Sequence, residues 1–283
     1  MKPGTLGADP DPPPTTAVIV AAGAGERLGA GTPKAFVELG GEPMLAHSVR
    51  AFLACEAVHD VVCVVPAEHV ERTHRLLARA HLAVTAVTAG GASRQESVSL
   101  GLVSCPSSAR IVAVHDASRP LVSPALIGRV VAALTTPWDA VAPALPVVDT
   151  LKLVDGAQRR VLRTIDRRGV WAVQTPQVLS RITLERVHAR VATAADAATD
   201  DLSLVERAGG RVRLIEGDRR NVKITYPNDL ALAEAILSAQ RRDARAPSAA
   251  PTVPDQPPAG RFRPDPSVSG PPTGVSDPGP FPR

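Results

Sequence analysis

Residues 16–34 read TAVIVAAGAGERLGAGTPK, an uncharged apolar run that passes directly into a glycine-rich turn. The run over residues 16–22 is short and is bounded by glycine, which predicts a buried strand. At Gly23 and Gly25 the backbone N–H groups can approach phosphate oxygens, because no Cβ stands in the way. In open α/β sheets, ligands bind at the carboxyl ends of the strands. This stretch therefore predicts a phosphate-binding turn at the end of the first strand.

Two other phosphate-binding motifs fit the turn poorly. A dinucleotide-binding fingerprint requires a third glycine three residues after Gly25, where Leu28 stands, and an acidic residue after the second strand, where residues 65–66 are Val-Pro. A P-loop requires the sequence GK[ST], which the turn lacks. A purely structural turn would not need the two cations Arg27 and Lys34 as well as its glycines. These two side chains predict a site that stabilises charge on a phosphoryl group.

Downstream of the turn, apolar runs alternate with amphipathic stretches of helical spacing. Strands are predicted at residues 60–65, 83–88, 111–115, 170–174 and 211–216. Helices are predicted at residues 42–55, 67–80, 94–103, 123–135, 180–195, 200–208 and 228–244. Strands that alternate with helices of this length indicate βαβ units. The expected fold class is α/β, with a Rossmann-like, mostly parallel sheet flanked by helices.

A polar stretch interrupts this alternation at residues 145–165. Residues 150–154 and 160–165 read as two strands around Asp155-Gly156, a pair that favours a tight hairpin because glycine tolerates positive φ. Charged side chains, among them Lys152 and Arg163, make the hairpin too polar for a core. It is therefore predicted to form a protruding β-hairpin arm, at about residues 146–166, that packs against a second subunit.

Proline clusters at both ends of the chain. Residues 1–15 and 245–283 contain few large apolar side chains, so they cannot bury enough surface to offset the entropy of ordering. We expect a disordered N-terminal extension, a folded domain over residues 16–244 and a Pro-rich disordered tail. The first residues lack the apolar core of a secretory signal, and residues 17–22 are too short to cross a bilayer. These features predict a soluble cytoplasmic protein.

The composition argues against several classes of function. The formal net charge is +4 and aromatic residues make up 2% of the chain, whereas nucleic-acid-binding proteins usually carry a basic stripe or stacking aromatics. Neither nucleic acid nor a membrane is an expected partner, and a small positive excess suits small anionic substrates. Cys55, Cys63 and Cys105 show no CxxC pairing, so neither a disulfide framework nor a structural zinc site is expected.

The glycine-rich turn also resembles a family signature. GxGxR followed by Pro-Lys is similar to the N-terminal signature of the sugar-nucleotide and cytidylyl transferases. Later motifs resemble the 2-C-methyl-D-erythritol 4-phosphate cytidylyltransferase family, and they are GGASR at 90–94, VHDASRP at 114–120, PVVDTLK at 146–152, QTPQ at 174–177, TDD at 199–201 and NVKIT at 221–225. The resemblance implies a sheet of the nucleotide-diphospho-sugar transferase type. It also implies transfer of CMP from CTP to 2-C-methyl-D-erythritol 4-phosphate, with release of pyrophosphate, in non-mevalonate isoprenoid biosynthesis.

The same resemblance implies the residues of the site. Nucleotide contacts are implied at Ala21, Ala22, Gly23, Gly25, Gly90, Gly91, Ser97, Asp116 and Ala117. Catalytic cations are implied at Arg27, Lys34, Arg167 and Lys223. The polyol phosphate is implied to bind Thr150, Arg167 and Lys223, the first two reaching across from the arm of a second subunit in a homodimer. Mg²⁺ is the implied cofactor, held mainly by the CTP phosphates with Asp116 nearby.

Several alternatives stay open at this point. Many members of the family carry an acidic residue where Ala92 stands, which leaves one base or ribose contact open. Asp116 could cap the turn at residues 117–120 instead of serving a metal ion, and helix capping explains Asp200-Asp201 better than metal binding does. For the whole chain, the alternatives are a ribitol 5-phosphate or other sugar-phosphate nucleotidyltransferase and a non-catalytic nucleotide-binding regulator.

Overall fold

The structure is a computed structural model of the 283-residue chain. It describes residues 13–23, 28, 32–156, 159–191 and 200–245. The chain divides into two units, Met1–Ala244 and Arg245–Arg283, and the fold below is that of the first. Residues 1–12 and 246–283 lie outside the described residues, so the disorder expected at both ends stays a prediction. Within the described ranges, no helix is long and apolar enough to cross a membrane.

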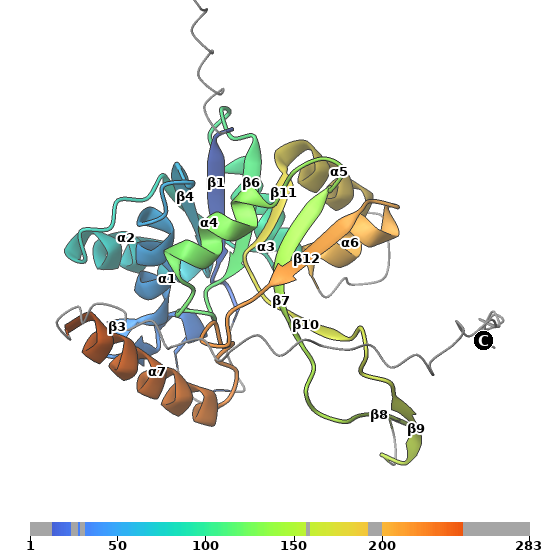
Figure 1. The fold of residues 1–283 in the computed structure, drawn as a ribbon. Helices are drawn as coiled ribbons and strands as arrows, with labels where there is room; N and C mark the ends of the chain where they lie inside the picture. The colour runs from blue at the N-terminus through green and yellow to red at the C-terminus, as the bar shows by residue number, and fades with distance from the viewer. Residues whose placement is uncertain (1–12, 24–27, 29–31, 157–158, 192–199, 246–283) are drawn as a thin grey trace, which may run out of the picture. The chain divides into compact units, whose positions relative to one another are not determined.

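A central sheet of eight strands organises the first unit. Its strands are β1 (Thr15–Val20), β4 (Asp60–Val65), β5 (Ala86–Ala89), β6 (Ile111–Asp116), β7 (Ala140–Pro146), β10 (Trp171–Val173), β11 (Gln177–Ser180) and β12 (Val212–Glu216). Their order is β10-β7-β11-β6-β1-β4-β5, with β12 paired to β7 (Figure 1). β10 and β11 run opposite to the other strands, which are parallel to one another. The predicted Rossmann-like, mostly parallel sheet is confirmed.

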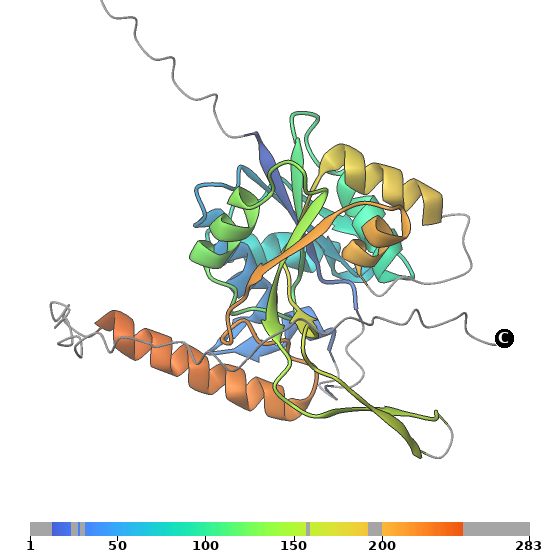
Figure 2. The ribbon, with the colours of Figure 1, turned by 45° about the vertical axis from the view of Figure 1, so that its right-hand side comes forward.

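Helices cover both faces of this sheet (Figure 2). They are α1 (Met44–Leu53), α2 (Val70–Arg79), α3 (Arg94–Val103), α4 (Pro124–Ala132), α5 (Arg181–Val191) and α6 (Asp201–Arg207). A further helix, α7 (Pro227–Arg245), packs instead on a third apolar cluster that includes Leu39 and Met44. Successive side chains of a strand point to opposite faces, so β1 contributes to two cores. Ile19 belongs to one apolar cluster with Phe52 of α1 and Ile127 of α4. Val18 belongs to a second cluster with Val98 of α3.

Local sequence signals set several of these boundaries correctly. The helix predicted at 94–103 and the strand predicted at 60–65 have the observed bounds. The Ser123 hydroxyl caps α4 by accepting from the backbone N–H of Leu126, and Pro124 opens the helix. The helix predicted from residue 42 begins later, at Met44, because Glu42–Pro43 pairs as the short strand β3 with β2 (Glu38–Leu39).

Two strands of the sheet, β7 and β11, carry no sequence prediction. Pro143 lies in the middle of β7, and proline inside a run argues against a central strand because it has no N–H to donate. In the structure, Pro143 stands between the residues paired with β11 and those paired with β10, so it falls where the strand changes partner. β11 is only four residues long. A pattern this short does not distinguish a strand from a loop.

The polar stretch after β7 forms a separate two-stranded sheet (Figure 2). β8 (Leu151–Val154) pairs antiparallel with β9 (Val161–Ile165), and most of their side chains are exposed. The antiparallel pairing around Asp155 agrees with the hairpin predicted there. Its role as an arm that packs against a second subunit stays a prediction.

Candidate active site

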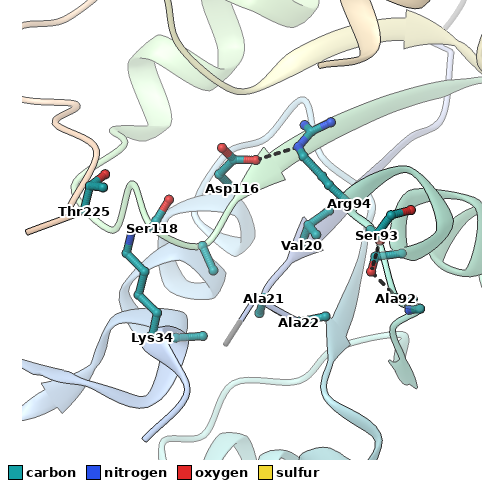
Figure 3. A pocket seen from close by; sticks show the side chains of 15 residues that line it. Val20, Ala21, Ala22, Lys34, Ala92, Ser93, Arg94, Asp116, Ser118 and Thr225 are labelled. Carbon is teal, nitrogen blue, oxygen red and sulfur yellow. Dashed lines mark hydrogen bonds and ion pairs between the residues drawn. The ribbon is translucent and has the colours of Figure 1, made fainter. Parts of the chain in front are cut away.

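A cavity of about 650 Å³ lies at the carboxyl ends of β1 and β6, beside the first residues of α3 (Figure 3). Open α/β sheets bind their ligands at this edge. The lining residues are Val20, Ala21, Ala22, Gly23, Lys34, Ala35, Gly91, Ala92, Ser93, Arg94, Ser97, Asp116, Ala117, Ser118 and Thr225. Five separate stretches of the sequence therefore meet at one place.

Most of the residues predicted to bind nucleotide line this cavity. They are Ala21, Ala22, Gly23, Gly91, Ser97, Asp116 and Ala117, and the predicted catalytic residue Lys34 lines it as well. Gly90 adjoins the cavity without lining it, and Lys223 reaches it through Asp116. Gly25 and Arg27 lie outside the described residues.

The predicted residues of the hairpin lie elsewhere. Thr150 and Arg167 are exposed, and neither lines the cavity. One guanidinium nitrogen of Arg167 donates a hydrogen bond to the carbonyl of Val148 in the same chain. A single chain thus brings seven of the nine predicted nucleotide contacts to one cavity without these two side chains.

Backbone hydrogen bonds fix the turn that follows β1. The N–H of Ala21 donates to the carbonyl of Val64 at 2.7 Å, and the N–H of Ala117 donates to the carbonyl of Val20 at 3.0 Å. These bonds continue the parallel ladder to the point where the chain leaves the sheet. At Gly23, an added Cβ would meet no atom within 4 Å in the part of the chain that the structure describes. Glycine at this position therefore leaves open space on the cavity side.

Gly90 has a different reason to be glycine. A Cβ at this position would lie 2.4 Å from the Cβ of Ala22 and 2.9 Å from the hydroxyl of Ser97. The Ser97 hydroxyl accepts from the N–H of Gly91 at 3.1 Å and donates to the carbonyl of Ser93 at 2.8 Å. Gly90 and Ser97 thus pack the 90–93 turn against the turn after β1, which brings both turns to the same cavity.

Two side-chain hydrogen bonds, close to the pattern of a capping box, fix the start of α3. The Ser93 hydroxyl accepts from the N–H of Glu96 at 3.1 Å, and the Glu96 carboxylate accepts from the N–H of Ala92 at 2.8 Å. Glu96 therefore places a carboxylate beside Ala92.

Arg94 and Asp116 form the charged centre of the cavity. Arg94 Nε lies 3.1 Å from Asp116 Oδ1, and Lys223 Nζ lies 2.8 Å from Asp116 Oδ2. Burial alone would raise the pKa of Asp116, but Arg94 and Lys223 outweigh it and hold that pKa well below its ordinary value. Asp116 is therefore ionised at neutral pH. Its carboxylate oxygens contact Arg94 and Lys223, and among the described residues no side-chain hydrogen bond joins Asp116 to the turn at residues 117–120.

Arg94 also reaches a carboxylate in the core. Its Nη1 lies 2.7 Å from Oδ2 of Asp201, whose side chain is fully buried. Asp201 Oδ1 lies 2.9 Å from Nε2 of His188, and burial raises the pKa of Asp201 less than His188 and Arg94 lower it. The neighbouring Asp200 caps α6 by accepting from the N–H of Ser203. The two aspartates therefore have separate structural roles.

Sequence reasoning did not assign Arg94 or Asp201 to the site. Arg94 stands in the GGASR motif and Asp201 in the TDD motif, so both residues lie in motifs that pointed to the family. What the sequence does not show is that two side chains 107 positions apart share an ion pair. In the described ranges, no group of three or more His, Cys, Asp and Glu side chains could hold a metal ion by itself.

His115, beside Asp116, fixes the backbone at the end of β6 from within the core. The ring is fully buried, with Nε2 3.2 Å from the carbonyl of Arg119 and Nδ1 3.0 Å from the hydroxyl of Thr175. A carbonyl only accepts, so Nε2 carries the proton and Nδ1 accepts from Thr175. The same hydroxyl accepts from the N–H of Asp116 at 3.2 Å. A neutral His115 thereby holds the backbone at the end of β6.

Comparison with known proteins identifies the family. The family model described as 2-C-methyl-D-erythritol 4-phosphate cytidylyltransferase matches residues 15–239. A protein of that name from Streptomyces avermitilis is 46% identical over 235 residues, covering 80% of this chain and 93% of the relative. Another from Nocardia farcinica is 48% identical over 222 residues, covering 78% of this chain and 93% of the relative.

A solved structure agrees with these relatives. The protein of the same name from Thermus thermophilus gives a TM-score of 0.65 at 34% identity, covering 78% of this chain and 98% of that chain. The resemblance seen in the sequence motifs is confirmed over most of the chain. The chain belongs to the 2-C-methyl-D-erythritol 4-phosphate cytidylyltransferase family.

Proposed function

We propose that this protein transfers CMP from CTP to 2-C-methyl-D-erythritol 4-phosphate, which yields 4-diphosphocytidyl-2-C-methyl-D-erythritol and pyrophosphate. Family membership supports the reaction. The cavity at the ends of β1 and β6 supports the location of the active site, because the turn at residues 21–23, Lys34 and Asp116 all line it. The reaction belongs to the non-mevalonate route to isoprenoid precursors.

In this proposal the nucleotide lies between the two turns that line the cavity. The turn after β1, with Ala21, Ala22 and Gly23 and continuing through Gly25, would hold the triphosphate through backbone N–H groups. The turn at Gly90 and Gly91 would hold the cytosine, because backbone carbonyls can accept from its amino group. The Ser97 hydroxyl already binds both sides of that turn, so its part is to shape the base site.

The chemistry requires positioned cations and little else. A phosphate oxygen of the acceptor attacks the α-phosphorus of CTP, and the bond to the bridging oxygen breaks as pyrophosphate leaves with the electron pair. The attacking oxygen is already ionised, so no general base is needed. Lys34, whose side chain extends toward Ser118 in Figure 3, would stabilise the charge that develops on the phosphoryl group. Arg27 is proposed to share this role.

We also propose Mg²⁺ as the cofactor. Among the described residues that line the cavity, Asp116 is the one acidic side chain, and Arg94 and Lys223 already contact its carboxylate. A single carboxylate fits an ion held chiefly by phosphate oxygens, with Asp116 as the protein ligand. When bound, Mg²⁺ would neutralise charge on the triphosphate and on the leaving pyrophosphate.

The acceptor site is proposed to be shared between two subunits. Thr150 and Arg167 lie away from the cavity of their own chain, on the exposed stretch that carries β8 and β9. In a homodimer joined through this hairpin arm, they would reach the cavity of the second subunit and bind the polyol phosphate together with Lys223. Cationic partners are needed there, because the attacking phosphate approaches a triphosphate of like charge.

The proposed domain and compartment follow from the sequence. We place the catalytic domain at residues 16–244 and the reaction in the cytoplasm. All three cysteines are buried with free thiols, which suits a reducing compartment.

Pyrophosphate release tests the proposal directly. The full chain is incubated with CTP, Mg²⁺ and either 2-C-methyl-D-erythritol 4-phosphate, ribitol 5-phosphate or a hexose 1-phosphate. Fast release with the first acceptor alone supports the proposal. Preference for ribitol 5-phosphate would identify the alternative transferase, and CTP binding without release from any acceptor would identify a non-catalytic regulator.

A further inference from the structure

A second cavity, of about 650 Å³, lies between α2 and the residues of β3 and the start of α1. The residues that line it are Glu42, Pro43, Ala46, Arg72, Arg75, Leu76, Arg79 and Ala80. It shares no lining residue with the cavity at the ends of β1 and β6. The reaction proposed above makes no use of it.

Three guanidinium groups give this cavity its charge. Arg72, Arg75 and Arg79 follow one another at spacings of three and four residues, which places them on one face of α2. Arg75 lies 3.8 Å from Glu71 at the exposed helix surface. Among the described residues, Arg72 and Arg79 form no ion pair. Exposed pairs such as Arg75–Glu71 are weak, so Arg75 remains available to a stronger anion.

Glu42 is the one acidic side chain among the described residues that line this cavity, and it already pairs with Arg50. Both carboxylate oxygens of Glu42 accept from Arg50, each at 2.8 Å. This paired hydrogen bond, the largest of the causes, lowers the pKa of Glu42. Because Arg50 neutralises Glu42, the net charge facing the cavity is positive.

The remaining walls are apolar. Pro43, Ala46, Leu76 and Ala80 supply them, and Ala46 is buried beneath the others. If the three arginines served only as a solvated helix surface, no apolar pocket would be expected beside them. A cationic rim over an apolar floor instead matches a ligand that carries an anionic head on a short apolar segment.

One of the arginines is held in place before any ligand binds. The Arg72 guanidinium lies over the ring of Phe36, 4.8 Å from its centroid, and the ring of His69 packs beside Phe36 at 4.8 Å. A cation held over an aromatic face loses less freedom when it binds an anion. Phe36 also belongs to the short helix η2 (Lys34–Phe36), whose first residue lines the nucleotide cavity.

We propose that the α2 cavity is a binding site for a small molecule with a phosphate or diphosphate group on a short apolar segment. Arg72, Arg75 and Arg79 bind the phosphate oxygens, for which the fork of a guanidinium is well suited. Leu76, Ala80 and Pro43 contact the apolar part. The ligand is distinct from CTP and occupies a site of its own.

Calorimetric titration of the full chain with n-butyl phosphate tests this assignment. We expect saturable binding that is weakened about tenfold or more in Arg75→Gln/Arg79→Gln, since hydrogen bonds to charged groups are the stronger ones. Inorganic phosphate should bind less tightly than n-butyl phosphate, because it leaves the apolar walls unused. Ala80→Trp, which fills the cavity without altering its charge, should also abolish binding.

Control experiments distinguish binding at this site from nonspecific attraction to positive charge and from binding in the nucleotide cavity. Arg186→Gln/Arg242→Gln removes two exposed helical arginines elsewhere and should leave the affinity unchanged. Saturating CTP and the Lys34→Ala substitution should leave it unchanged too, so failure of the proposed transferase reaction would not affect this result. Equal weakening in both double variants, competition by CTP, or no binding at millimolar concentrations would overturn the proposal.

Discussion

Nε of Arg94 lies 3.1 Å from Oδ1 of Asp116, where the end of β6 meets the start of α3. The same guanidinium binds Asp201 in the core at 2.7 Å, and Asp116 binds Lys223 at 2.8 Å on its other side. A continuous row of charges therefore runs from the fully buried Asp201 to the cavity. Such a row fixes the Asp116 carboxylate in one orientation before a nucleotide arrives.

Arg94→Met tests how much this row contributes to stability. The substitution leaves Asp116 and Asp201 without their shared cation, and an uncompensated buried charge is strongly destabilising. We expect the free energy of unfolding to fall by about 3 kcal/mol, measured by denaturant titration at pH 7. Arg168→Met is the matched control, because Arg168 pairs with Asp166 at an exposed position. Its effect should be much smaller, because exposed ion pairs are weak, and equal effects in the two variants would contradict the prediction.

The buried His115 predicts a loss of stability in mild acid. Burial lowers the pKa of His115 from 6.5 to about 4, although Asp116 partly opposes the shift. Between pH 6.5 and about 4, His115 is therefore protonated in the unfolded chain and neutral in the folded chain. Stability is complete above pH 6.5 and should fall by about 3 kcal/mol as the pH drops toward 4.

Thermal or chemical unfolding from pH 7 to 4.5 measures this slope. A charged His115 would have N–H donors on both ring nitrogens, and Thr175 could no longer donate to Nδ1 while accepting from Asp116. His115→Gln, which has no titrating ring, should give a flatter profile. A variant that keeps the wild-type slope would assign the acid sensitivity to other groups.

Gly23 and Gly90 predict opposite effects of the same substitution. A Cβ at Gly23 meets no atom of the described residues within 4 Å, so Gly23→Ala should leave the melting temperature unchanged and weaken CTP binding by blocking close approach of the phosphates. A Cβ at Gly90 would lie 2.4 Å from Ala22, so Gly90→Ala must shift a turn and should lower the melting temperature. Thermal melts and CTP titrations of both variants check the pair. Equal melting temperatures would refute the packing role of Gly90.

The first half of the sheet was predictable because its signals are local. Apolar runs of strand length, helical spacing and the Ser123-Pro124 start of α4 each lie within a few residues, so β4, β6 and α3 have the expected places. β7 was missed because Pro143 argues locally against a strand, while its actual environment depends on three partner strands. At Pro143 the local pattern argues against a strand, but pairing with the three neighbouring strands makes the segment part of the sheet.

The site was predictable to a similar extent. Chemistry and motif order predict the glycine turn and Lys34, since phosphate binding needs free backbone N–H groups and a cation, and residues 21–23 and Lys34 do line one cavity. The ion pair of Arg94 with Asp201 could not, because a salt bridge across 107 positions has no local pattern. Gly90 was predicted as a nucleotide contact, and the structure adds a steric reason for glycine that the sequence does not show.

Lys34 is expected to be essential for turnover. It lines the cavity next to the turn after β1, and a preorganised charge stabiliser typically contributes about 10²-fold or more to kcat. Lys34→Ala should therefore lose activity of that order at saturating CTP and acceptor, with an unchanged melting temperature. Arg242→Ala, at an exposed position on α7, serves as the control for loss of a positive charge. A loss below about threefold in steady-state assays would remove Lys34 from the mechanism.

Mixing two inactive variants tests whether the active site is shared. If Arg167 serves the cavity of the second subunit, Lys34→Ala and Arg167→Ala damage different chains of each site. A heterodimer of the two variants then contains one site with both residues intact and one site with neither. After co-refolding in equal amounts, about half of the dimers are mixed, so about a quarter of the wild-type activity should return. If both residues act within one chain, every site in every dimer keeps one defect, and the mixture stays as inactive as its components.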